Sequence, residues 1–202
     1  PMIDLNIINY GINGNKLNAK LNTKNNGIKR IHGDISDYKY NWEGTNYNQI
    51  YNNWIDLPTN IIDNIRYDFT ISFWSIDNII HNNDNDTTLL FVNDELKEKT
   101  NSTIFEAEKN NLLLSFKIPN SDNDVIFKIG NAFGKIYEVS AKYINIKPGE
   151  LNNWIIQKQV KENKMILRIY INSDLLVEKV FSTNILFPVG NFNCMLGLNS
   201  TS

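Results

Sequence analysis

Residues 152–181, NNWIIQKQVKENKMILRIYINSDLLVEKVF, decide the fold class of this chain. Two sets of side chains alternate along the middle of this stretch: Met165, Leu167, Ile169 and Ile171 in one set, and Ile166, Arg168 and Tyr170 in the other. A period of two in a run rich in β-branched and aromatic residues predicts a strand. Residues 161–164 (KENK) and 172–174 (NSD) supply turns, because Asn and Asp tolerate the backbone angles of tight hairpins. The stretch therefore predicts a meander of three short strands, with a tryptophan opening the first.

The composition is that of a globular protein. The chain has 202 residues, of which 42% are hydrophobic and 21% charged. This length suits one all-β domain whose core is large enough to fold without disulfides or a structural metal. Cys194 is the only cysteine, so no internal disulfide forms. A net charge of −2 gives no global attraction to nucleic acid. No apolar run approaches the roughly 20 residues of a membrane span. We therefore expect neither a nucleic-acid partner nor a membrane span.

Short segments with strand character recur along the whole chain, separated by turn residues. They are residues 4–10, 16–21, 27–32, 36–42, 54–58, 68–76, 87–93, 102–107, 111–118, 124–129, 135–139 and 192–198. The best helix candidate is a single turn within residues 58–65. Many short strands with almost no helix predict an all-β fold, an antiparallel β-sandwich or a barrel. Without a linker, a repeat or a break in composition, we expect one domain over residues 1–202.

Five motifs, taken in order, resemble the laminin-G-like, concanavalin A-like lectin superfamily. They are WIDLP (54–58), DFTISFW (68–74), NNWIIQKQV (152–160), ILRIYINSDLLVEKV (166–180) and FNCMLGLN (192–199). Ser173 stands where glycine is usual in the hairpin of such domains. The chain is also similar to the lectin-like N-terminal half of the receptor-binding region of clostridial neurotoxins. The resemblance covers residues 50–202 and implies a jelly-roll β-sandwich, with Trp74 and Trp154 in core or inter-sheet packing.

Members of this superfamily usually carry one more strand after the Leu-Gly segment, and this sequence stops at Ser202 without it. An unpaired sheet edge invites aggregation. We therefore expect the chain to be a fragment of a longer secreted, cell-surface or virion protein. The alternative is that a partner supplies the edge.

A run of aromatic residues interleaved with amides is the most suggestive feature for ligand binding. It comprises Tyr38, Tyr40, Trp42, Asn46, Tyr47 and Tyr51. Sugars are held by flat apolar rings against their C–H surfaces and by amides on their hydroxyl groups, and this segment offers both kinds of group. The same aromatic side chains would serve equally well in the core between two sheets. The sequence leaves both interpretations open.

Calcium is a further candidate ligand, because relatives often bind it at the rim of the sandwich. Asp84 and Asp86, or Asp122 and Asp124, offer hard oxygen ligands in loops. Neither run has the glycine and the distal glutamate of an EF-hand loop. Carboxylates that alternate with amides in loops are also ordinary solvated turns. We expect no other cofactor.

Catalysis has little support in the residues. Glycoside hydrolysis needs a pair of carboxylates that project into one cleft. Glu106 and Glu108 share a strand face, but the flanking acid and the apolar register of a catalytic strand are absent. His32 and His81 show no spacing typical of metal ligands, and no nucleophile elbow is present. We expect a protein that is not an enzyme.

Two functional hypotheses follow. In the first, the chain is a non-catalytic binding module that recognises a glycan or a protein receptor. In the second, it is a structural domain of a virion, phage or toxin-complex assembly, whose sheet faces are buried against neighbouring subunits. Exposed aromatic side chains in one patch would favour the first, and a large apolar surface would favour the second.

Overall fold

The computed structural model of the chain describes residues 6–7, 19–22, 28–32, 38–42, 54–57, 61–76, 87–93, 112–118, 123–131, 134–144, 150–187 and 192–198. One short helix, α1 (Ile61–Asn64), interrupts a succession of strands within these residues. The strands are β1 (Asn6–Ile7), β2 (Ala19–Asn22), β3 (Ile28–His32), β4 (Tyr38–Trp42), β5 (Trp54–Leu57), β6 (Phe69–Ile76), β7 (Thr87–Asn93), β8 (Leu112–Lys117), β9 (Asp124–Gly130), β10 (Ile136–Lys142), β11 (Leu151–Lys161), β12 (Lys164–Ile171), β13 (Asp174–Phe181) and β14 (Phe192–Leu198).

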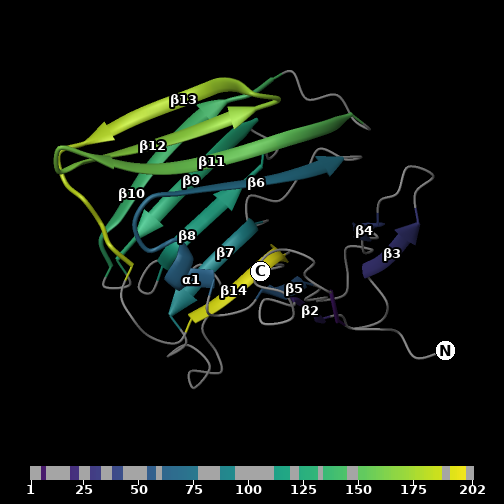
Figure 1. Cartoon of the computed structure of the whole chain (residues 1–202). Helices are drawn as coiled ribbons and strands as arrows, with labels where there is room; N and C mark the ends of the chain where they lie inside the picture. Colours follow the sequence, from purple (N-terminus) through teal and green to yellow (C-terminus); the bar gives the residue numbers. More distant parts are fainter. Residues whose placement is uncertain are drawn as a thin grey trace.

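Two antiparallel sheets form the body of the protein (Figure 1). The larger has the order β1-β2-β5-β14-β7-β8-β9-β10, and the smaller has the order β13-β12-β11-β6. Strands β3 and β4 pair separately as a two-stranded sheet. The predicted all-β sandwich is confirmed, and so are the bounds of the predicted strands at 87–93 and 192–198. The strand predicted at residues 102–107 lies outside the described residues.

The C-terminal meander folds as the turn residues predict. Strands β11, β12 and β13 are joined by two-residue turns, and Glu162, Asn163, Asn172 and Ser173 all have φ between 51° and 75°. Two consecutive residues in the left-handed region are typical of the type I′ turn, whose twist matches that of a hairpin. The second turn is also tied to β11, because the Asn153 backbone N–H donates to Asn172 Oδ1 at 2.9 Å and Asn172 Nδ2 donates to Asn152 Oδ1 at 3.0 Å. The asparagines thus fix the turn.

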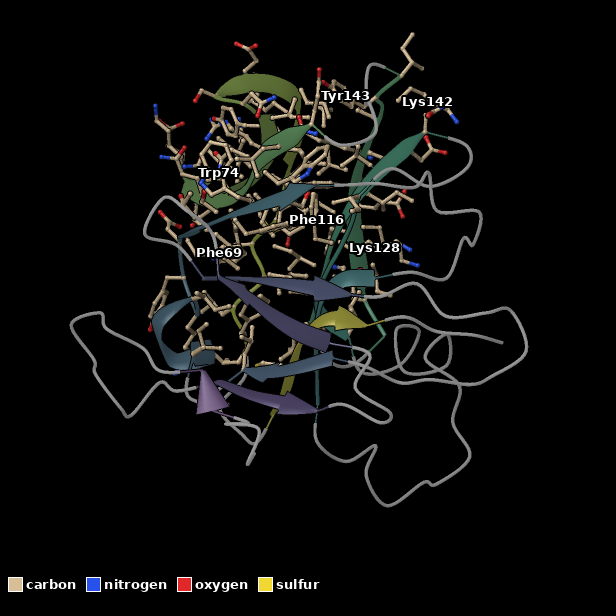
Figure 2. The ribbon with its side chains drawn as sticks, turned by 90° about the vertical axis from the view of Figure 1, so that its right-hand side faces the viewer. Phe69, Trp74, Phe116, Lys128, Lys142 and Tyr143 are labelled. Atoms are coloured by element: carbon tan, nitrogen blue, oxygen red, sulfur yellow. The ribbon has the colours of Figure 1, made fainter. Side chains whose placement is uncertain are left out.

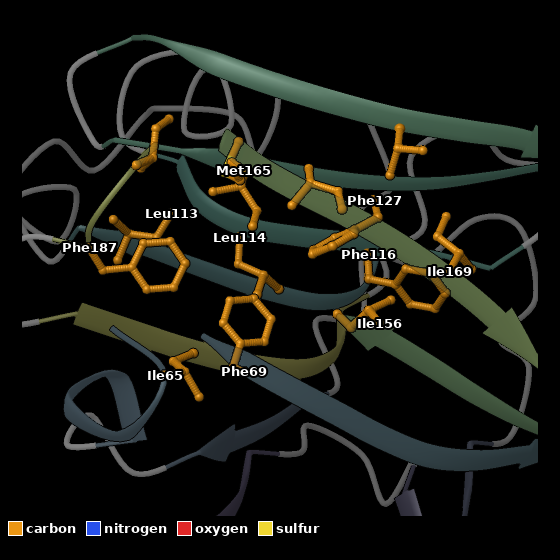
Figure 3. Packing of buried hydrophobic residues seen from close by; sticks show 14 of the residues in the cluster. Ile65, Phe69, Leu113, Leu114, Phe116, Phe127, Ile156, Met165, Ile169 and Phe187 are labelled. Atoms are coloured by element: carbon orange, nitrogen blue, oxygen red, sulfur yellow. The ribbon is translucent and has the colours of Figure 1, made fainter. Parts of the chain in front are cut away.

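The core lies between the two sheets (Figure 3). The set of alternating residues predicted to share a face, from Met165 to Ile171, is buried. Trp154 is fully buried, which confirms its predicted place between the sheets. Its ring packs against Phe116 of β8 at 5.9 Å and Tyr143 at 6.0 Å between centroids, and its Nε1–H donates to Ser75 Oγ at 3.1 Å. The indole therefore contacts both sheets while its single donor is satisfied.

The two sheets also meet at one lateral edge, where β13 lies beside β10. Tyr137 and Phe181 pack edge to face with their ring centroids 5.1 Å apart. Lys179 Nζ donates to the carbonyl oxygen of Glu138 at 3.1 Å, so a backbone acceptor on edge strand β10 is occupied. A lysine placed on an edge strand also discourages pairing with another chain.

Lys158 occupies an unusual position for a lysine. It is 1% exposed on the inward face of β11, where Nζ donates to the carbonyl oxygen of Tyr67 at 2.6 Å and lies 5.9 Å from the centre of the Phe187 ring. Burial lowers the pKa of its amine to about 8, and the nearby Asp68 carboxylate acts in the opposite direction. The protonated amine is thus less stable here than in water. Burial likewise raises the pKa of the Cys194 thiol, to about 12.

Replacing Ser173 by glycine should stabilise the protein. Ser173 has a φ of 75°, which costs a residue with a Cβ roughly 1 kcal/mol and costs glycine nothing. After allowing for the greater entropy of the unfolded chain, S173G should raise the free energy of unfolding by about 0.5 kcal/mol in urea denaturation. The matched control is S140G within β10, which should lower it. A loss of stability in S173G would contradict the turn assignment.

Stability should also depend on pH through Lys158. Its folded pKa of about 8 lies below the ordinary 10.5, so between these values the unfolded chain binds a proton that the folded chain does not. The free energy of unfolding should therefore rise as the pH increases through this window, by up to about 3 kcal/mol. Urea denaturation at pH 7, 8, 9 and 10 measures the rise.

The variant K158M should lose this part of the pH dependence, because its side chain does not titrate. The exposed Lys164 on the adjacent strand offers the control variant K164M, which should keep the full slope. Equal slopes in the wild type and in K158M would show that the rise has another origin.

Candidate functional site

The side chains on the solvent side of the four-stranded sheet form the candidate site, which we call the outer face. They alternate along each strand with residues that enter the core. The outer face comprises Thr70, Ser72 and Trp74 of β6; Ile155, Gln157 and Gln159 of β11; Ile166, Arg168 and Tyr170 of β12; and Leu175, Glu178 and Val180 of β13.

A row of polar side chains crosses the middle of the outer face. The strand register places Glu178, Arg168, Gln157 and Thr70 opposite one another on four successive strands. Arg168 Nε donates to Glu178 Oε2 at 2.5 Å, and its Nη1 donates to Gln157 Oε1 at 2.7 Å and to Gln159 Oε1 at 2.9 Å. Gln157 Nε2 in turn donates to Thr70 Oγ1 at 3.2 Å. The guanidinium fork thus holds both amides in fixed orientations.

Trp74 lies on the same face with 64% of its surface exposed. The expectation that it packs in the core or between the sheets is wrong. The strand alternates, and Phe69, Ile71 and Phe73 take the inward positions, so Trp74 faces solvent. Figure 2 shows Trp74 and Lys128 on opposite sides of the sandwich, with Phe116 between them.

Polar groups lie directly beside the exposed indole. Asn153, the cross-strand partner of Trp74, donates from Nδ2 to Ser72 Oγ at 3.0 Å and to the carbonyl oxygen of Phe73 at 3.2 Å. The buried amide of Asn153 therefore holds the Ser72 hydroxyl in place on the same face as the exposed aromatic ring. This is the combination of groups that protein sites use to hold a sugar ring.

A cavity of about 320 Å³ opens at the other end of β6. It is lined by Asp68, Phe69, Thr70, Gln157, Lys158 and Gln159. Thr70 and the two glutamines belong both to this cavity and to the polar row. Thr70 and Trp74 are four residues apart on one strand, which is roughly 13 Å. The outer face thus combines a polar hollow and an exposed indole along a single strip.

Three of the six residues that the sequence indicated for ligand binding lie in the described part of the chain, and they are not on the outer face. Tyr38, Tyr40 and Trp42 belong to β4, where they stand opposite His32, Arg30 and Ile28 of β3 in the two-stranded sheet. The structure describes the backbone of these strands but not their side chains. Asn46, Tyr47 and Tyr51 lie outside the described residues. Binding by this segment stays a prediction.

The calcium prediction also falls mainly outside the described residues. Asp84, Asp86 and Asp122 are not described, and neither are Glu106 and Glu108. Asp124 Oδ2 is paired with Lys142 Nζ at 3.0 Å across β9 and β10. Within the described ranges, no group of three or more His, Cys, Asp or Glu side chains is placed to hold a metal ion. Calcium binding therefore remains a prediction, at Asp84 and Asp86 or at Asp122 and Asp124.

The sequence did not point to the outer face as a site. The alternation showed that Ile166, Arg168 and Tyr170 share one side, but nothing in it marked that side as a polar network. The signal that could have revealed this network was the pairing register of β11, β12 and β13. Arg168, Gln157 and Glu178 carry complementary groups at positions that the two tight turns bring opposite one another.

Comparisons with known proteins give structural likeness and no sequence family. No protein-family model and no curated protein matches the chain. Among solved structures, the chain is similar to the receptor-binding domain of botulinum neurotoxin type G, with a TM-score of 0.56 and 14% identity over 100% of this chain and 44% of that one. It is also similar to an endo-β-1,4-glucuronan lyase from the fungus Trichoderma reesei, with a TM-score of 0.50 and 11% identity over 89% of this chain and 75% of that one.

At such low identity the likeness concerns the fold alone. Both structures are β-sandwich proteins, which agrees with the jelly-roll type of sandwich inferred from the sequence motifs. The chain spans less than half the length of the neurotoxin domain that it matches. Among the described residues, no helix is long and apolar enough to cross a membrane.

Proposed function

We propose that this chain is a non-catalytic binding module for an extracellular glycan, and that the outer face is its binding surface. The observation that carries the proposal is the exposed indole of Trp74, 64% accessible, beside side-chain amides and hydroxyls held in a fixed network. Removing the apolar surface of an exposed tryptophan from water lowers the free energy, so a ligand that covers the indole would be stabilised. A pyranose ring offers the apolar C–H surface that would cover it.

The dimensions of the strip suit more than one sugar unit. The cavity beside Thr70 and Gln157 and the indole of Trp74 lie roughly 13 Å apart along β6. One residue of an oligosaccharide would stack on the indole while another places its hydroxyls in the polar hollow. The Arg168 fork already orients the glutamine amides, so little side-chain entropy is lost when the glycan binds.

The structural likeness adds modest support for a binding role. One similar structure is described as a receptor-binding domain, which is compatible with a module that recognises an extracellular receptor. The other is described as a lyase. Two carboxylates lie in the proposed site, Glu178, which is paired with Arg168, and Asp68 in the hollow, whose Oδ1 accepts from the Val160 N–H. A paired carboxylate next to a guanidinium is poorly suited to acid–base chemistry. We therefore propose binding without catalysis.

A second candidate function is a structural contact with a protein neighbour. Leu175 and Val180 of β13 are 54% and 51% exposed on the outer face, and Leu151 is 55% exposed at the start of β11. Several exposed apolar side chains on one sheet favour a protein interface. The two candidates differ in the ligand that covers Trp74.

The proposal predicts that W74A loses glycan binding. On a glycan array, and by calorimetry with the best glycan, W74A should bind at least ten-fold more weakly than the wild type, because the stacking surface is gone. Its urea denaturation midpoint should barely change, since the side chain is exposed. The matched control is Y67A, which removes an aromatic side chain that is 60% exposed outside the outer face and should bind as the wild type does.

Two further arms separate the alternatives. W42A tests the aromatic segment of β4, and a parallel array without calcium tests the Asp84 and Asp86 loop. Loss of binding in W42A but not in W74A would contradict the outer-face assignment. A folded, monodisperse chain that binds no glycan under either condition would overturn the glycan proposal and leave the structural contact as the better candidate.

A further inference from the structure

A second cavity lies at the end of the sandwich where the β9–β10 hairpin meets the segment after β13. Its volume is about 340 Å³, at the lower end of the range for small-molecule pockets. It is lined by Asn131, Lys135, Tyr137, Thr183, Asn184, Ile185 and Leu186. Figure 1 shows the segment that follows β13 passing the start of β10. None of these residues belongs to the outer face.

Both walls of this end cavity are held by backbone hydrogen bonds. In the hairpin, the Asn131 N–H donates to the carbonyl oxygen of Lys135 at 3.2 Å, and the Lys135 N–H donates to Asn131 Oδ1 at 3.1 Å. In the other wall, the carbonyl oxygen of Thr183 accepts from the Met165 N–H at 2.9 Å. Ile185, 6% exposed, anchors the same segment in the core. These hydrogen bonds tie Asn131 to Lys135 in one wall and Thr183 to β12 in the other.

The charge of the lining is positive. Lys135 is the one charged residue among the seven, and Nζ lies 5.4 Å from the centre of the Tyr137 ring. That ring is itself packed against Phe181, so the ammonium group is held over a fixed aromatic face. Lys128 and Lys142 of the same hairpin pair with carboxylates, whereas none pairs with Lys135 in the described part of the chain.

The other lining residues are of the kind that bind hydroxyl groups. Asn131 and Asn184 carry amides and Thr183 carries a hydroxyl, while Leu186 adds a partly exposed apolar side chain. A single ammonium among amides and hydroxyls fits a ligand with one negative charge and several hydroxyls. From this lining we infer that the end cavity binds an acidic monosaccharide, with its carboxylate on Lys135.

The inference is tested by comparing the affinities of the chain for galacturonate, galactose and acetate. Galacturonate should bind the wild-type chain with a Kd in the millimolar range, as followed by chemical shift changes at Asn131, Thr183 and Asn184 in NMR titrations. Galactose lacks the carboxylate and acetate lacks the hydroxyls, so each should bind at least ten-fold more weakly. The affinity for galacturonate should fall as sodium chloride is raised, because the contact is a charge pair near the surface.

The deciding variant is K135Q, which removes the charge, keeps a polar end and shortens the side chain by one atom. It should weaken galacturonate binding at least ten-fold. The matched control is K142Q, at the far end of β10 and roughly 20 Å away, which should bind as the wild type does. N184A provides a second variant in the opposite wall and should also bind more weakly.

Three results would overturn the inference: no shift at 20 mM galacturonate, equal affinity in K135Q, or equal affinity for acetate and galacturonate. Because the end cavity and the outer face share no residue, W74A should bind galacturonate normally. The inference and the proposed function can therefore fail separately.

Discussion

The register of β11 is the constraint on which both faces of the smaller sheet depend. This strand pairs with β6 along one edge and with β12 along the other, over eight residue pairs on each side. With a side-chain period of two, one choice of register sends Trp154, Ile156 and Lys158 into the core. The same choice places Gln157 between Arg168 and Thr70 on the outer face. A slip of one residue would exchange the two sets and destroy both the core and the polar row.

Much of this architecture could be predicted from the sequence because it rests on local signals. The inward set from Met165 to Ile171 and both turns were predicted from alternation and from Asn-containing turn segments. Trp74 was misplaced by the motif resemblance and not by the alternation. It shares its side of β6 with Thr70 and Ser72, opposite Phe73, and this polar side is the one that faces solvent. A motif shared with other proteins gives the position of a tryptophan in a strand but not the side of this sheet that the second sheet covers.

The candidate sites were harder to predict because they join segments that are far apart in the sequence. The polar row joins β6 to β11 across more than 80 residues of sequence, and the end cavity joins a hairpin to a segment nearly 50 residues later. Lys158 is a further case, since an amine on the inward side of an alternating strand gives no sign that the carbonyl oxygen of Tyr67 will satisfy it. Composition and spacing describe neighbours along the chain, whereas these sites are made by neighbours across sheets.

The same hydrogen bonds that stabilise the smaller sheet also hold the polar side chains of its outer face in fixed orientations. Arg168 is 18% exposed and Glu178 is 39% exposed, so their pair contributes only modestly to stability. Its larger effect is geometric, because a guanidinium that is shared among one carboxylate and two amides leaves few rotamers open to any of them. Polar side chains that are already rigid lose less conformational entropy when a ligand binds than mobile polar side chains do. The outer face thus presents polar groups in fixed orientations beside exposed apolar side chains, Trp74 above all, and the proposed binding role depends on this arrangement.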